Sequence, residues 1–129
     1  SSDVCSSDLL GYINDSKIAK GYHYHPTIAV SVEGTPIGIL DSKIWVRETI
    51  SNEVDKIKKC NLLSNKPIEE KESFKWLESY RKLCEIEQSN LDSFHFVTVC
   101  DREADMFDLF HEHSIRTNEN KPDLLIRSK

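Results

Sequence analysis

The sequence lacks any apolar stretch that could cross a membrane. Its longest apolar runs are four or five residues, whereas a membrane-spanning helix needs about 20. It also lacks the basic segment followed by an apolar one that marks a secretory signal peptide. Its net charge is not positive, since 17 Lys and Arg residues stand against 22 Asp and Glu residues, which argues against a free-standing nucleic-acid-binding protein. We therefore expect a cytoplasmic protein with no membrane partner.

Several catalytic motifs are absent as well. The sequence has no glycine-rich phosphate-binding loop, no Gly-x-Ser-x-Gly nucleophile motif and no Cys/His nucleophile pair. Its four cysteines, Cys5, Cys60, Cys84 and Cys100, include no pair at the two-residue spacing of zinc knuckles and redox centres. Two disulfides would be possible, but Cys84 and Cys100 lie in apolar segments, which favours reduced thiols in a cytosolic protein.

What is present suits a single globular domain. The chain has 129 residues, of which 38% are hydrophobic and 30% charged, values typical of a folded domain rather than of a disordered tail. It does not begin with Met, and it stops within an apolar and basic run, residues 124–129. We therefore expect a piece of a larger domain.

The first nine residues differ from the rest. Residues 1–9 contain Ser-Ser-Asp twice and show neither a helical nor a strand period. They are similar to peptides that arise when sequencing-adapter DNA is translated, so we expect a non-native segment; the alternative is an ordinary flexible, polar terminus. In either case residues 10–129 remain as the domain.

Alternating apolar residues predict a β-hairpin early in the domain. In residues 27–32 every second residue is apolar, which is typical of a half-buried strand whose inner face includes Ile28 and Val30. Residues 33–35 form a turn signal, and residues 37–46 give a second, less regular strand. Two strands this close in sequence should pair antiparallel.

Helices and strands alternate after the hairpin. Residues 48–63 are helix-permissive but weakly patterned, whereas residues 68–86 carry apolar side chains every three to four residues and begin with an acidic turn, which favours a helix. Residues 94–99 predict a short strand, a helix begins near Met106, and a last strand opens at Leu124. This order predicts a mixed α/β domain whose sheet is incomplete on its N-terminal side.

Asp101 is the residue best placed for chemistry. It follows the strand at 94–99 directly, and the carboxyl ends of strands are where α/β sheets collect ligands. A carboxylate there would suit Mg²⁺, but an Asp before a helix is also a common N-cap. Arg102 would contact a phosphate or pair with a neighbouring carboxylate. Glu103 and Asp108 are acids of the kind expected in first helical turns.

The histidines are the other candidates for metal binding. His23 and His25 project to the same side of a strand, but no third ligand is evident near them, which favours a structural or solvent-facing role. His111 and His113 would not share a face of a helix. His95 alternates with phenylalanines on a strand, where intermediate burial is expected.

Three stretches in a fixed order carry a resemblance to a known family. They are His-Pro-Thr-Ile-Ala-Val, Gly-Thr-Pro-Ile-Gly-Ile-Leu and Ile-Trp-Val-Arg within residues 25–47, Ile-Glu-Glu-Lys-Glu-Ser-Phe-Lys-Trp at 68–76, and Val-Cys-Asp-Arg-Glu-Ala-Asp-Met at 99–106. The Glu-Lys-Glu-Ser-x-x-Trp and Asp-Arg-Glu-Ala-Asp blocks are the most diagnostic. Together the stretches resemble the catalytic core of bacterial cut-and-paste transposases of the insertion-sequence-four, transposon-five type, over nearly all of residues 10–129.

The resemblance implies a ribonuclease-H-like mixed sheet with flanking helices. In such enzymes two Asp and one Glu hold two Mg²⁺ ions for phosphodiester cleavage and strand transfer. Asp101 matches the second Asp of that triad. Arg127 matches an Arg that contacts transposon-end DNA phosphates, a task that suits a planar guanidinium, and Lys129 is a further candidate contact. The first Asp, the Glu and the central first strand of the sheet would lie outside residues 10–129.

Two consequences follow for the chain alone. With one of three metal ligands it should bind Mg²⁺ weakly and be inactive, whereas the whole enzyme would act as a homodimer on double-stranded transposon ends at the bacterial nucleoid. Without the central strand, the hairpin and the strand at 94–99 should be separated by a gap, pair directly in a non-native way, or expose an edge.

Three alternatives to a transposase fragment remain. One is another metal-dependent nuclease or phosphatase of the same fold. The second is a non-catalytic transposase remnant that acts as a DNA- or protein-interaction module. The third is a plain α/β domain in which Asp101 only caps a helix. A Glu on a downstream helix, with the family's Tyr-Arg-Glu-Lys arrangement, would separate a transposase from the first alternative.

Overall fold

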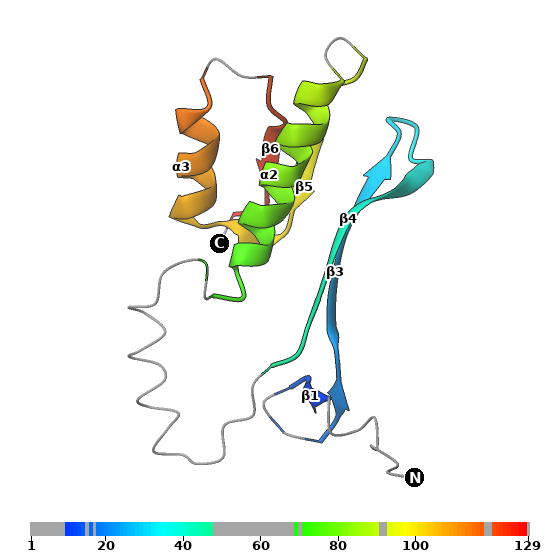
Figure 1. Ribbon diagram of the computed structural model, residues 1–129, viewed down its shortest axis with the longest axis vertical. Coiled ribbons are helices and arrows are strands. Elements are labelled where there is room, and N and C mark those ends of the chain that lie inside the picture. The colour runs from blue at the N-terminus through cyan, green and yellow to red at the C-terminus, as the bar shows by residue number, and fades with distance from the viewer. Residues whose placement is uncertain are drawn as a thin grey trace.

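The structure of the chain is a computed structural model (Figure 1). It describes residues 10–14, 16, 18–47, 69, 71–90, 93–117 and 120–128. The expectations for residues 1–9, for a helix within 48–63 and for Lys129 therefore lie outside the described residues. None of the helices that are described has the length and apolar character that crossing a membrane requires.

The predicted hairpin is confirmed. Strand β3 (His23–Val30) pairs antiparallel with β4 (Pro36–Trp45), from the pair His23↔Trp45 at the open end to Val30↔Pro36 at the turn. Gly34 has a φ of 89° in that turn, a backbone conformation that glycine adopts without steric cost. A smaller antiparallel pair, which the sequence did not suggest, joins β1 (Gly11–Tyr12) to β2 (Lys20–Gly21).

The second half of the chain folds as a compact α/β unit. Helix α2 (Phe74–Ser89) precedes β5 (Val97–Cys100), a short 3-10 helix η3 (Arg102–Ala104), α3 (Phe107–Ile115) and β6 (Asp123–Ile126). Strands β5 and β6 are parallel, and α3 connects them. The predicted order of strands and helices, and with it the mixed α/β class, is confirmed.

Helix α2 begins later than the sequence predicted. The expected start near residue 68 and the acidic first turn are wrong, because α2 starts at Phe74 and has no acidic residue in its first turn. Glu72 precedes the helix and is bound instead by Arg47, whose Nε and Nη2 lie 2.7 and 2.9 Å from its two carboxylate oxygens. This guanidinium lowers the pKa of Glu72. A long-range ion pair therefore replaces the expected helix-dipole interaction.

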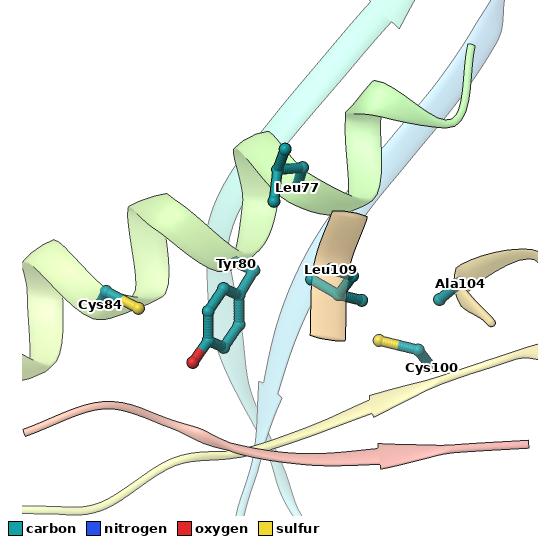
Figure 2. Close-up of a cluster of buried hydrophobic side chains, with 6 residues drawn as sticks. All are labelled: Leu77, Tyr80, Cys84, Cys100, Ala104 and Leu109. Atoms are coloured by element: carbon teal, nitrogen blue, oxygen red, sulfur yellow. The ribbon is translucent and has the colours of Figure 1, made fainter. Parts of the chain in front are cut away.

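The core lies between α2, α3 and the β5–β6 pair. Figure 2 shows its six buried side chains: Leu77, Tyr80, Cys84, Cys100, Ala104 and Leu109. Tyr80 is 1% exposed, and its hydroxyl donates to the Pro122 carbonyl at 3.3 Å. Burial raises the pKa of Tyr80 and raises that of the Cys100 thiol to about 11. The predicted apolar face of α2 is thus the inner face of the domain.

Glu112 joins the two helices at the edge of this core. It is 9% exposed, and its carboxylate accepts hydrogen bonds from Arg81 on α2 at 3.0 Å and from Arg116 at 2.8 Å. The bond from Arg81 is the main reason that the pKa of Glu112 is lowered. A buried carboxylate with two guanidinium partners holds α3 against α2.

The hairpin packs against α2 with the face opposite to the expected one. Ile28 and Val30 are 55% and 54% exposed, so the prediction that they line the inner face is wrong. The half-buried residues of β3 alternate with them and include His25 and Thr27, and the Thr27 hydroxyl bonds that of Ser79 on α2. The residues of α2 that meet this face include Ser79 and Trp76, which contacts the His25 ring.

No hydrogen-bonded ladder connects the hairpin to β5 and β6 within the described part of the chain. Figure 1 shows β3 and β4 as a long arm beside α2, whereas β5 and β6 lie behind the helix in this view. The incomplete sheet was expected to leave a gap, to pair the hairpin directly with β5, or to expose an edge. Direct pairing of the hairpin with β5 is not observed among the described residues. Each two-stranded sheet keeps edges without a strand partner among the described residues.

Candidate functional site

Three of the four predicted site residues lie at one edge of the β5–β6 sheet. Because these strands are parallel, their carboxyl ends meet at the same edge. Asp101 and Arg102 follow β5, Arg127 follows β6, and the Arg127 N–H donates to the Cys100 carbonyl at 3.2 Å. All three site residues are exposed. The structure therefore brings one carboxylate and two guanidinium groups to a single accessible edge.

Asp101 is both an N-cap and an accessible carboxylate. Its backbone is extended, with φ −82° and ψ −173°, and its Oδ1 accepts the N–H of Glu103 at 2.9 Å. Its carbonyl accepts the N–H of Ala104 at 3.1 Å. The capping geometry that was the alternative to metal binding is thus present, but it uses one carboxylate oxygen. A carboxylate has lone pairs on both oxygens, so capping leaves Oδ2 able to bind a cation.

Buried residues on both sides hold Asp101 at the surface. Cys100 is 8% exposed and Ala104 is 0% exposed, and both belong to the core. The chain enters the turn from a strand and leaves it through η3. The backbone on either side of the carboxylate is therefore anchored by packing, while the carboxylate itself points away from the core.

Sequence reasoning missed the contact between Lys75 and Glu103. Lys75 is on the first turn of α2, and its Nζ lies 2.8 Å from Glu103 Oε2, two residues after Asp101. The two residues are 28 positions apart, so no local pattern could pair them. Glu103 belongs to the Asp-Arg-Glu-Ala-Asp block, but Lys75 falls on an unspecified position of the Glu-Lys-Glu-Ser-x-x-Trp block, so the resemblance did not mark the pair either.

The two histidines of β3 pack on tryptophans. His23 stacks on Trp45 with ring centroids 5.3 Å apart, and His25 meets Trp76 edge-on at 4.5 Å. Burial and then the nearby Lys75 ammonium lower the pKa of His25, although the carboxylates of Asp101, Glu103 and Asp41 act in the opposite direction. The lowered pKa favours the neutral form of His25. The expected structural role fits both histidines.

The basic residues beside the hairpin do not form a site for anions. Asp41, Lys43, Glu78, Arg81 and Lys82 are among the residues that line a surface hollow between β4 and α2. Lys43 is bound by Glu78, and Arg81 and Lys82 pair with Glu112 and Glu85. Opposite charges therefore neutralise this hollow. The predicted phosphate contacts, Arg102 and Arg127, lie elsewhere, at the β5–β6 edge.

Among the described residues, the candidate metal ligand at this edge is Asp101. Within the described residues no three His, Cys, Asp or Glu side chains are grouped as a metal site. Asp101 could supply one of the carboxylate ligands of Mg²⁺, since this ion binds through one or two carboxylates and keeps several waters. A complete two-metal site would need further carboxylates at the same edge.

Comparisons with protein-family models, with curated proteins and with solved structures found no match to this chain. A function cannot be inferred from a fold alone, because one fold supports many functions. The features that point to a function are the residues at the β5–β6 edge and the sequence block at 99–106, which contains Asp101 and Arg102.

Proposed function

We propose that residues 10–129 are part of the catalytic core of a DNA transposase, which cleaves phosphodiester bonds at transposon ends and transfers the strands. The observation that supports this most is the position of Asp101, an exposed carboxylate at the carboxyl end of a parallel strand, with Arg102 and Arg127 at the same edge. In this proposal the sheet is ribonuclease-H-like, and its central strand is outside residues 10–129.

In the proposed reaction the carboxylate binds metal and the basic residues bind DNA. Asp101 holds Mg²⁺ together with carboxylates from outside the described residues. Such ions, when bound, would activate a water or 3′-hydroxyl and stabilise the leaving oxygen. Arg127 binds a DNA phosphate, a contact for which a planar guanidinium is well suited, and Arg102 and Lys129 are further phosphate contacts. The enzyme acts as a homodimer on double-stranded ends in the bacterial cytoplasm.

The test is the substitution Asp101→Asn in the full-length protein. Asn keeps the size of the side chain and an oxygen that can cap η3, but it removes the charge that a metal requires. We expect cleavage of transposon-end DNA to fall by roughly 10³-fold or more, because the metals supply several kcal/mol of stabilisation. End binding, measured by gel shift in Ca²⁺, should remain.

Asp108→Asn is the matched control. Asp108 is an exposed carboxylate in the first turn of α3, so its loss removes the same charge a few residues from the edge. We expect this variant to cleave normally. Normal cleavage by Asp101→Asn would contradict the role of Asp101 as a metal ligand. Absence of cleavage by the wild-type protein would favour the alternative, a non-catalytic transposase remnant that acts as a DNA- or protein-interaction module.

A further inference from the structure

Lys75 joins three parts of the chain beside Asp101. Its side chain is 14% exposed, and Nζ lies 2.8 Å from Glu103 Oε2. The same ammonium lies over two indole rings, 5.3 Å from the Trp45 centroid on β4 and 5.6 Å from the Trp76 centroid on α2. Because an ammonium is attracted to carboxylates and to the faces of aromatic rings, these contacts together define where it lies.

Glu103 transmits this contact to Asp101. Its carboxylate binds Lys75, and its backbone N–H donates to Asp101 Oδ1 at 2.9 Å. The next residue, Ala104, is fully buried, so the turn is fixed on one side by packing and on the other by Lys75. Glu103 therefore links the Lys75 ammonium to the Asp101 carboxylate directly, since it contacts both.

We propose that Lys75 is a positioning residue for Asp101 and acts through Glu103, an inference that rests on the proposed function. The ammonium carries no lone pair, so it does not itself bind the metal. It fixes the direction of the Asp101 carboxylate by holding the residue that donates to it. It also occupies the Glu103 carboxylate, which would otherwise compete with Asp101 for the cation.

The first measurement follows the Glu103 amide proton by NMR in the 129-residue chain, at a concentration below that at which the chain self-associates. In Lys75→Met we expect this amide to exchange with water roughly fivefold to tenfold faster, as expected when a hydrogen bond of ordinary net strength is loosened. Lys75→Arg should restore slow exchange, because a guanidinium also binds a carboxylate and stacks on indoles.

Lys82→Met is the control for the amide measurement. Lys82 lies on the same helix and forms an exposed ion pair with Glu85 at 3.3 Å, so its loss should leave the Glu103 amide unchanged. An unchanged Glu103 exchange rate in Lys75→Met would overturn the inference. Equal acceleration in Lys75→Met and Lys82→Met would overturn it too, since that result would reflect general loosening.

The second measurement uses the full-length enzyme and its Mg²⁺ dependence. We expect Lys75→Met and Glu103→Gln to raise the Mg²⁺ concentration that gives half-maximal cleavage by about tenfold, an effect typical of residues that orient metal ligands. Lys75→Arg should restore the wild-type Mg²⁺ dependence.

If the wild type cleaves by way of Asp101 but Lys75→Met keeps the wild-type Mg²⁺ dependence, the inference fails and the proposed function stands. If the wild type shows no Asp101-dependent cleavage, the proposed function fails and the amide exchange alone decides whether Lys75 positions Asp101.

Discussion

His95 lies between two carboxylates that belong to different elements. Its Nδ1 is 2.6 Å from Glu87 Oε1, and its Nε2 is 3.0 Å from Asp123 Oδ2. Glu87 is 3% exposed, and its other oxygen accepts the N–H of Phe96 at 3.1 Å. A neutral imidazole carries one N–H, so only the imidazolium donates to both carboxylates. The bond to Asp123, followed by that to Glu87, raises the pKa of His95.

The raised pKa of His95 makes stability depend on pH. Its contribution is fully present below the unfolded pKa, near 6.5, and is lost as the pH rises through the higher folded value. The bond from His95 lowers the pKa of Asp123, whose contribution is lost only as the pH falls below its ordinary 3.8. The charges of His113 and Lys121 also lower the pKa of Asp123. We expect the thermal unfolding midpoint to decrease as the pH rises from about 6.5 to about 8.

Two variants isolate this effect. His95→Gln should have a nearly flat unfolding midpoint over the same pH range, because Gln does not titrate. His111→Gln is the control, since His111 stacks on Phe107 at 5.6 Å on the surface of α3, and it should keep the wild-type slope. A wild-type slope that persists in His95→Gln would refute the assignment.

At the scale of elements, α2 makes two different kinds of contact. Toward the hairpin its contacts include three polar ones: Lys43 with Glu78, Thr27 with Ser79, and Arg47 with Glu72 just before the helix. Toward α3, β5 and β6 it buries Leu77, Tyr80 and Cys84. Exposed ion pairs contribute about 0–1 kcal/mol each, whereas burying a Leu side chain contributes about 1.5–3 kcal/mol. The hairpin is therefore held more weakly than the sheet of β5 and β6.

This difference predicts unequal protection from hydrogen exchange. Amides of β3 and β4 should exchange at lower denaturant concentration than amides of α2 and β5, because the hairpin can open without exposing the core. Leu77→Ala should lower the unfolding free energy of the α2–β5–β6 unit by about 2–4 kcal/mol, and Arg47→Ala by less than about 1 kcal/mol. Mass-detected hydrogen exchange and urea unfolding measure both quantities. Uniform protection across hairpin and core would contradict this division.

For the whole molecule, the main feature is that the β3–β4 hairpin and the β5–β6 sheet both expose apolar side chains. On the hairpin, the cross-strand pairs Tyr24↔Ile44 and Ile28↔Ile39 are between 52% and 64% exposed. On the β5–β6 sheet, Val99 is 72% exposed and its cross-strand partner Leu125 is 59% exposed. A contiguous apolar face next to an open strand edge promotes self-association.

We expect the 129-residue chain to associate as its concentration rises. Light scattering should show an apparent mass that increases with concentration, and the double variant Ile28→Thr and Ile39→Thr should reduce this increase because it removes an apolar cross-strand pair but keeps β-branched residues. Ile115→Thr is the control, since Ile115 is 59% exposed at the end of α3 and outside both sheets. A monomeric wild type at every concentration, or an equal effect of the control, would contradict this prediction.

Local pattern was sufficient for the order of strands and helices, for the antiparallel hairpin and for the apolar face of α2. These features depend on periodicity and turn residues, which act over a few positions of the chain. The position of Asp101 after a strand was predictable for the same reason. The start of α2 was not, because the bidentate pair of Glu72 with Arg47 across 25 positions cannot be read from a helical period.

Packing alone settled the remaining features. The sequence contains the apolar face of the hairpin, but it cannot specify which face α2 covers, since that depends on contacts such as the bond between Thr27 and Ser79, 52 positions apart. It places Asp101 and Arg127 at the ends of separate strands, and only the parallel register of β5 and β6 brings them to one edge. Elements form through short-range periodicity, whereas a site requires residues distant in sequence to meet, and tertiary packing provides that meeting.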